Sequence, residues 1–263
     1  MVNFQGKSNY DIYDLVRLME LLCGPDGCPW DRAQTHESIR RNMLEEAYEA
    51  AEAIDTGNME HLREELGDVL MQVVFHSGMA KKSGHFDIDE VADETCKKLI
   101  RRHPHIFGDV KVKDGQESLV VWDNIKRAEK KQETVTESLE GVARSLPALW
   151  RAEKIQGKAA KVGFDWHDIS GVLAKLHEEL GELTEAISSG GAAAAEELGD
   201  VLFAVTNLAL HLDVDPEEVL HATCDKFISR FGGMEALAKS QGKELDEMTL
   251  EEMDKLYNQA KNG

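Results

Sequence analysis

The sequence predicts an all-α protein built from two tandem helical-bundle domains. Apolar residues recur three or four positions apart over long stretches, and no short segment alternates convincingly between apolar and polar residues as a strand would. The chain contains only five prolines, which leaves room for long helices. The pattern of the first half also recurs in the second. We therefore expect a first domain at residues 1–107, a helical linker at 108–144 and a second domain at 145–263.

Four apolar stripes mark the main helices, two in each half of the chain. In chain order the stripes are Leu44, Ala47, Tyr48, Ala51 and Ile54; Leu62, Leu66, Val69, Leu70 and Val73; Leu176, Leu180, Leu183 and Ile187; and Leu198, Val201, Leu202, Val205 and Leu208. The short segments DTGN and SSGG interrupt the two pairs of stripes. Because such segments favour turns, each pair is predicted to form an antiparallel helical hairpin.

The internal repeat consists of matching segments in the same order. The first copy contains LEEAYEA, EELGDVLMQVV and TCKKLIRR, and the second contains HEELGEL, EELGDVLFAVT and TCDKFISR. A tryptophan beside an aspartate precedes each copy, as Trp30 with Asp31 and Asp165 with Trp166. This order predicts that the two domains share one helical architecture.

The charge of the chain excludes several classes of partner. Acidic residues outnumber basic ones by 50 to 30, which gives a formal net charge of -20. Nucleic acid polymers and anionic membranes bind basic surfaces, so we expect neither as a partner. No apolar run approaches the ~20 residues of a membrane span, and the N-terminus has no signal-peptide core. The four scattered cysteines are interpreted as reduced thiols, which predicts a cytoplasmic protein.

Each copy carries two groups of acidic residues on consecutive helices. In the first copy, helical spacing places Glu46 and Glu49 on one face with Glu45 at its edge, and Glu65 with Asp68 on the next helix. In the second copy the corresponding acids are Glu178, Glu179 and Glu182, opposed by Glu197 and Asp200. Acids on an amphipathic helix are most often a solvated face. Two observations favour a metal site instead. The arrangement occurs twice, and no Lys or Arg is expected to pair with these acids from four positions further along the helix, so their repulsion needs another compensating charge.

Carboxylates without histidine are typical ligands of Mg²⁺ or Mn²⁺ rather than of zinc or a di-iron centre. A basic pair at helical spacing follows the acids in each copy: Lys98 with Arg102, and Lys226 with Arg230. Taken alone, each pair is an ordinary basic surface. Beside a metal site, Lys and Arg are the donors that a polyphosphate requires, so the constellation predicts phosphoryl chemistry.

These motifs resemble the MazG nucleoside triphosphate pyrophosphohydrolases of the all-α NTP pyrophosphatase superfamily. The superfamily pattern EExxE followed by ExxD occurs at 45–49 with 65–68, and again at 178–182 with 197–200. Four longer segments are more specific to the two-domain MazG form: GCPWDRAQTH at 27–36, IRRHPHIF at 100–107, SLPALWRAEKIQ at 145–156 and VGFDW at 162–166. The resemblance covers nearly the whole chain.

The resemblance implies two tandem MazG-like helical domains, a homodimer, and Mg²⁺-dependent hydrolysis of NTPs or dNTPs to monophosphate and pyrophosphate, with a role in nucleotide-pool cleaning. The C-terminal copy is the one usually credited with the activity in the family. The implied metal ligands there are Glu179, Glu182, Glu197 and Asp200, matched in the first copy by Glu46, Glu49, Glu65 and Asp68. Glu178 or Glu179 would orient or deprotonate the attacking water.

The resemblance also implies the residues that bind the nucleotide. Lys175, Lys226 and Arg230 would hold the phosphates, matched by Lys98 and Arg102 in the first copy, and Tyr257 would lie against the base. Relatives often have tryptophan where Tyr257 stands, and some have a basic residue within the alanine run at 192–195. The alternative hypothesis is that one or both copies bind nucleotide without turnover or serve as dimerisation scaffolds. A carboxylate-bridged redox metal centre is a third and less favoured hypothesis.

Overall fold

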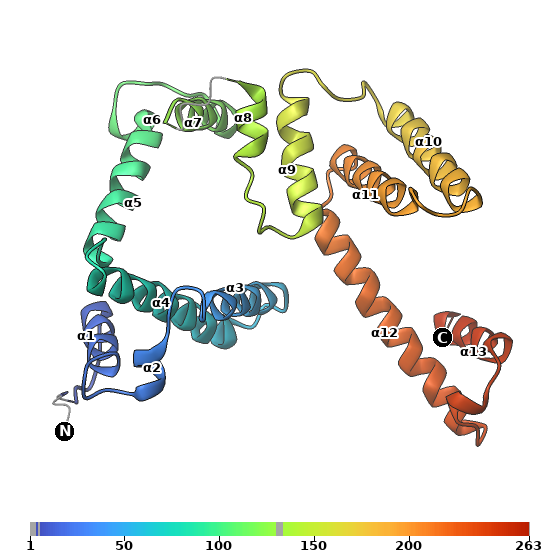
Figure 1. Ribbon diagram of the computed structural model, residues 1–263, viewed down its shortest axis with the longest axis horizontal. Coiled ribbons are helices and arrows are strands. Elements are labelled where there is room, and N and C mark those ends of the chain that lie inside the picture. The colour runs from blue at the N-terminus through green and yellow to red at the C-terminus, as the bar shows by residue number, and fades with distance from the viewer. Residues whose placement is uncertain (1–3, 5, 130–133, 263) are drawn as a thin grey trace. The chain divides into compact units, whose positions relative to one another are not determined.

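The computed structural model describes residues 4, 6–129 and 134–262, and every regular element within them is a helix (Figure 1). The prediction of an all-α chain with two tandem helical domains is therefore confirmed. The chain divides into two compact units, Met1–Lys126 and Arg127–Gly263. This division lies inside the predicted linker at 108–144, whose described part contains two helices. The exact linker boundaries stay a prediction.

The helices of the first unit are α1 (Ile12–Leu22), α2 (Pro29–Ala33), α3 (Arg40–Asp55), α4 (Met59–Lys82), α5 (Ile88–Arg102), α6 (Pro104–Phe107) and α7 (Gly115–Glu129), the last of which crosses the division between the units. α3 and α4 form a hairpin, and α1 packs against α4. The core of this unit contains Met19, Cys23, Ile39, Val74 and Phe75.

The second unit contains α8 (Val135–Glu140), α9 (Ala148–Ala160), α10 (Ile169–Ser188), α11 (Ala194–His211), α12 (Pro216–Ser240), a 3₁₀ turn (Leu245–Glu247) and α13 (Leu250–Asn262). α10 and α11 form a hairpin that α9 contacts through α11, and α12 pairs with α13. The α12–α13 pair has its own core of Met234, Ala238, Met248 and Leu256.

Both predicted hairpin turns are present. The DTGN segment ends α3, and Gly57 takes the left-handed φ of 67° that a residue without Cβ adopts most easily. Asn58 then caps α4 by accepting a hydrogen bond from the backbone N–H of His61. In the SSGG segment, Gly190 and Gly191 both have positive φ before α11 begins. Each turn therefore places the acidic residues of consecutive helices within one hairpin.

The hairpins pack through their acidic and small residues, and much of each apolar stripe faces outward. Ala50 and Ala53 are buried between α3 and α4, whereas Ile54 of the first stripe is 60% exposed. The same holds for Leu44, Tyr48, Leu66, Leu70, Leu180, Ile187, Leu198, Leu202 and Val205, all of which are exposed. Helical period shows which residues share a face, but a two-helix layer can bury only one face. The outward stripes therefore lack a covering layer within the described residues.

No helix in the described part of the chain combines the length and the apolar character that crossing a membrane requires.

Candidate metal and nucleotide site

Each hairpin brings carboxylates from its two helices into one cluster. In the first unit, Glu46 and Glu49 of α3 and Glu65 of α4 each offer an oxygen within 4.8 Å of the others. In the second unit, the corresponding oxygens belong to Glu179 of α10 and to Glu197 and Asp200 of α11, again within 4.8 Å. We call these groups the first and second cluster. Each contains three of the four metal ligands that the sequence predicted.

The fourth predicted ligand of each cluster lies close enough to act electrostatically. In the first cluster, burial is the largest cause that raises the pKa of Glu46, and the charges of Asp68, Glu49 and Glu65 raise it further, while a hydrogen bond with the buried Gln72 opposes the shift. Like charges therefore crowd this hairpin. A divalent cation among these carboxylates would relieve their repulsion.

The second cluster shows the same crowding at a different residue. The pKa of Glu197 is raised first by burial and then by the charges of Glu182, Asp200, Glu179 and Glu196. Here the acid whose pKa is raised lies on the second helix of the hairpin, whereas Glu46 lies on the first helix of its hairpin.

A lysine belongs directly to the second cluster. The Lys175 ammonium lies 2.7 Å from an oxygen of the buried Glu179 and 2.9 Å from an oxygen of the exposed Glu178. Hydrogen bonds with Glu179 and then Glu178 raise the pKa of Lys175 above its ordinary value, so it is charged at neutral pH. The expectation that these acids lack Lys or Arg partners is therefore wrong for Glu179. The partner lies four residues before the acid, whereas the prediction considers only positions four residues after it.

The first cluster has a histidine in a comparable role. His61 Nε2 lies 2.9 Å from Oε1 of Glu65, whose side chain is 9% exposed. Glu45, at the edge of this cluster, pairs with Arg41 at 2.7 Å, which also contradicts the expectation of unpaired acids. Sequence reasoning missed His61, although its position four residues before Glu65 on a predicted helix was the available signal.

Apart from Lys175, the predicted phosphate-binding cations lie on helices outside the hairpins. Lys226 is exposed and Arg230 is half-buried on α12, which packs mainly on α13 and α9 and has few contacts with α11. In Figure 1, α12 leaves the end of α11 and runs away from the α10–α11 hairpin. Within the described residues of one chain, no contact between these two cations and the second cluster is found.

In the first unit, Lys98 is exposed on α5, and the Arg102 guanidinium lies 5.3 Å from the centre of the Trp122 ring of α7. Lys126 approaches the same ring at 4.6 Å. A cation over an aromatic face is held by the ring quadrupole, so Arg102 helps to hold α7 against α5.

Tyr257 lies on α13, where its ring packs 5.9 Å from the ring of Phe227 on α12. Its side chain also contacts the α12–α13 core, which leaves it half-buried. The structure therefore places the predicted base-contacting residue beside the helix that carries Lys226, and not beside the second cluster.

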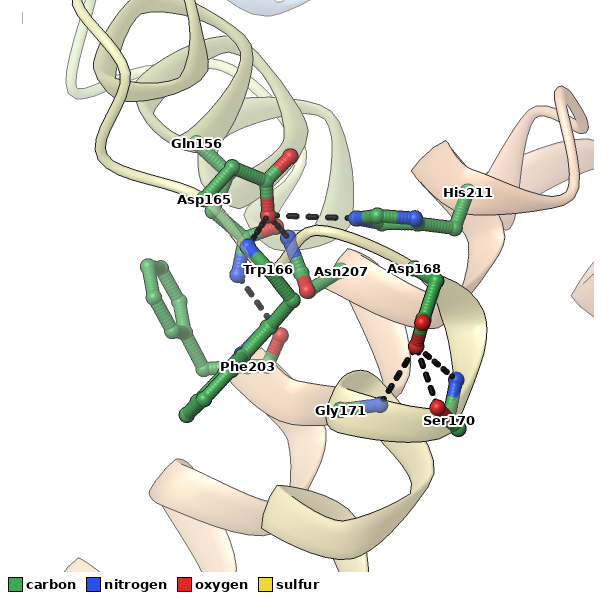
Figure 2. A network of polar contacts seen from close by, with 9 residues as sticks. All are labelled: Gln156, Asp165, Trp166, Asp168, Ser170, Gly171, Phe203, Asn207 and His211. Atoms are coloured by element: carbon green, nitrogen blue, oxygen red, sulfur yellow. Dashed lines mark hydrogen bonds and ion pairs between the residues drawn. The ribbon is translucent and has the colours of Figure 1, made fainter.

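The VGFDW segment anchors the second hairpin, as Figure 2 shows. The Asp165 carboxylate accepts hydrogen bonds from the Trp166 backbone N–H at 2.8 Å, from His211 Nε2 at 3.1 Å and from Asn207 Nδ2 at 3.2 Å. Burial raises the pKa of Asp165, but these hydrogen bonds outweigh it and the pKa is lowered. Asp165 thereby ties the connection before α10 to α11. Sequence reasoning missed Asn207 and His211 because more than forty residues separate them from Asp165.

Comparison with known proteins places this geometry in a family. Residues 34–107 and 168–232, together more than half of the chain, match the model described as the MazG nucleotide pyrophosphohydrolase domain. The chain belongs to the MazG family. The two matched segments contain the two clusters, so the MazG domain occurs once in each unit.

Relatives match nearly the whole chain. A Thermotoga maritima protein named nucleoside triphosphate pyrophosphohydrolase/pyrophosphatase MazG is 44% identical over 95% of both chains. The nucleoside triphosphate pyrophosphohydrolase of Escherichia coli K12 is 40% identical over 94% of this chain and 95% of its own. A Bacillus subtilis protein of uncharacterised function, YabN, is 48% identical over 91% of this chain but only 49% of its own length. This chain is accordingly an enzyme of the MazG family.

The matched MazG segments include Lys175, Lys226 and Arg230 but end before Tyr257. The VGFDW segment also lies outside them. The family match covers the acidic positions of both hairpins and the basic positions of α12, but the roles expected for these residues stay predictions. The same holds for the role expected for Tyr257.

Proposed function

We propose that this protein hydrolyses nucleoside triphosphates, whether NTPs or dNTPs, to the nucleoside monophosphate and pyrophosphate at the second cluster. The observation that carries the proposal is the convergence of Glu179, Glu197 and Asp200 within 4.8 Å, in a chain of the MazG family. Nucleotide-pool cleaning in the cytoplasm is the physiological role that we propose for this activity.

The residues of the second cluster fit Mg²⁺, with Mn²⁺ as a substitute. Every donor atom is a carboxylate oxygen, which is the ligand that hard divalent cations prefer. Glu182, whose charge acts on Glu197, would supply a fourth carboxylate. When bound, the metal would neutralise charge on the triphosphate and on the pyrophosphate that leaves.

Protein side chains would activate the attacking water and bind the nucleotide. Glu178 is not part of the second cluster, but Lys175 contacts both Glu178 and Glu179. This position suits Glu178 to accept a proton from the attacking water. The water oxygen forms a bond to the α-phosphorus as the bond from that phosphorus to the bridging oxygen breaks, so pyrophosphate leaves. Lys175, Lys226 and Arg230 would bind the phosphate oxygens, and Tyr257 would stack against the base.

The proposed reaction is tested with a panel of NTPs and dNTPs, using ³¹P NMR to identify products. We expect monophosphate and pyrophosphate in equal amounts in the presence of Mg²⁺, and no turnover after the metal is removed with a chelator. Release of inorganic phosphate together with a nucleoside diphosphate would show a phosphatase reaction and contradict the proposal.

We also propose that the protein acts as a homodimer. The exposed stripe residues Leu198, Leu202 and Val205 give α11 an outward apolar face, and a contiguous apolar surface of this kind is typical of an interface. Among the described residues of one chain, no contact joins the cations of α12 to the second cluster. A second copy offers a way both to cover the stripes and to complete the phosphate site.

The dimer is expected to have a mass of twice 29.3 kDa in light scattering. Replacing Leu202 by aspartate should yield a monomer, because a charge would be buried in the interface. Leu250 is 78% exposed near the start of α13 and serves as the matched control, since Leu250→Asp should leave the dimer intact. A wild-type protein that is monomeric at micromolar concentration would disprove the dimer.

The first cluster is the candidate for the alternative function, in which a MazG domain binds nucleotide without turnover or serves as a scaffold. Asn42 occupies the position in the first copy that Lys175 occupies in the second, one helical turn before the equivalent glutamate. The first cluster therefore has one fewer cation beside it for a phosphate, which favours this assignment.

A further inference from the structure

The two clusters differ in the side chain that contacts a buried glutamate. In the second cluster, Lys175 of α10 contacts Glu179 on the first helix of the hairpin. In the first cluster, His61 of α4 contacts Glu65 on the second helix. The repeat aligns Lys175 with Asn42 and His61 with Ala193, which lies just before α11. Neither contact therefore has a counterpart in the other copy.

Because of this difference, the glutamate that is paired with another side chain lies on a different helix of the hairpin in each cluster. The ammonium of Lys175 lies against Glu179, while burial and then the charges of nearby acids raise the pKa of Glu197 across the hairpin. In the first cluster the contact of His61 is with Glu65, while burial and then the charges of nearby acids raise the pKa of Glu46. Only the second cluster thus holds a permanently charged cation against an expected metal ligand.

We propose that Lys175 is the counter-ion of Glu179 and that this ion pair is displaced when a metal ion and a polyphosphate bind together. The second cluster would then bind a divalent cation weakly alone and more tightly with nucleotide, whereas the first cluster binds the cation by itself. This inference rests on the proposed function, because it assumes that both clusters bind metal.

Electrostatics explains why the two ligands depend on each other. The Lys175 ammonium occupies an oxygen of Glu179 at 2.7 Å, so a divalent cation that binds there must displace a positive charge and then lie beside it. The lysine side chain is 34% exposed and flexible, and it retains the exposed Glu178 as a second partner. Triphosphate oxygens provide the displaced ammonium with new acceptors. Each ligand thereby strengthens the binding of the other by the same factor.

The first cluster does not impose this competition. Asn42 has no charge to displace, and His61 contacts Glu65 on the opposite helix rather than Glu46 or Glu49. A divalent cation can therefore approach Glu46 and Glu49 without meeting an ammonium group.

The test measures Mn²⁺ binding to the full-length protein by EPR of the free ion, without nucleotide. Glu46→Gln weakens the first cluster so that the second can be observed, and Glu179→Gln does the reverse. In the Glu46→Gln background, Lys175→Asn should tighten Mn²⁺ binding about tenfold, in the range usual for coupled sites. In the Glu179→Gln background, Asn42→Lys should weaken binding by a similar factor.

Lys239→Asn is the matched control, because Lys239 forms the same kind of ion pair four residues from Glu235, at 3.0 Å, outside both clusters. It removes the same net charge and should leave Mn²⁺ affinity unchanged. A triphosphate analogue with a methylene group between the α- and β-phosphorus should tighten Mn²⁺ binding at the second cluster, and Lys175→Asn should reduce this enhancement.

Mn²⁺ binding that is unchanged or weaker in Lys175→Asn would overturn the counter-ion role while leaving the metal site itself intact. An equal gain in Lys239→Asn would also overturn it, because net charge would then account for the effect. Absence of Mn²⁺ binding in the wild-type protein, with and without the analogue, would overturn the proposed metal site and this inference together.

Discussion

Replacing Glu179 by glutamine is expected to reduce pyrophosphate release by about a hundredfold or more, which corresponds to a few kcal/mol of activation free energy. Glu179 is buried, belongs to the second cluster and is held by Lys175. The substitution preserves the shape of the side chain but removes the charge that would bind the metal. Steady-state assays with a dNTP and Mg²⁺ measure the loss.

Glu46→Gln is the matched control, since Glu46 occupies the same position in the first copy of the repeat. We expect this variant to keep most of the activity, because the second cluster is the proposed site of turnover. Equal loss in both variants would show that both clusters contribute to catalysis. Undiminished activity in Glu179→Gln would exclude the second cluster as the active site.

Replacing Asp215 by alanine is expected to destabilise the second unit by about 2–4 kcal/mol, which combines the loss of a helix cap with an unsatisfied indole N–H. The Asp215 carboxylate accepts backbone hydrogen bonds from Glu217 and Glu218 at the start of α12. It also accepts one from Trp150 Nε1 of α9 at 2.9 Å. Urea unfolding followed by circular dichroism measures the change in the free energy of unfolding.

Asp168→Ala separates the two contributions. Asp168 caps α10 in the same way, by accepting hydrogen bonds from the backbone N–H groups of Ser170 and Gly171 (Figure 2). Its hydrogen bonds come from the first turn of its own helix, so the expected loss is only about 1 kcal/mol. If Asp168→Ala and Asp215→Ala destabilise the protein equally, the contact between α9 and α12 adds nothing to stability.

Features set by local sequence could be predicted well. The helical spacing of apolar residues identified the hairpin helices, and the DTGN and SSGG segments identified their turns. The acidic clusters followed from the same reasoning, because residues three or four apart share a helix face and a short turn brings two such faces together. Glu46, Glu65, Glu179 and Glu197 accordingly lie where the repeat predicted them.

Features set by long-range packing could not be predicted in this way. The apolar period of α11 identifies Leu198 and Leu202 as one face, but it does not show whether another element covers that face. Likewise, the spacing of Lys226 and Arg230 places them together on α12 without fixing the direction in which α12 leaves α11. Contacts over such sequence distances depend on the whole fold rather than on the local sequence.

The contact between Lys175 and Glu179 is a different case, because it is local and could have been found. The prediction of unpaired acids considers only basic residues four positions after each acid, whereas Lys175 precedes Glu179 by four positions. Both directions bring side chains together on a helix. Testing both would have identified Lys175 as a neighbour of the buried glutamate, and His61 as the neighbour of Glu65.

The central claim, water attack on the α-phosphorus at the second cluster, is tested most directly by hydrolysing a dNTP in ¹⁸O-labelled water and locating the label by mass spectrometry. The account predicts one ¹⁸O atom in each nucleoside monophosphate and none in pyrophosphate, with label incorporation slowed about a hundredfold in Glu179→Gln. Label in pyrophosphate or in inorganic phosphate would place the attack on another phosphorus and contradict the account.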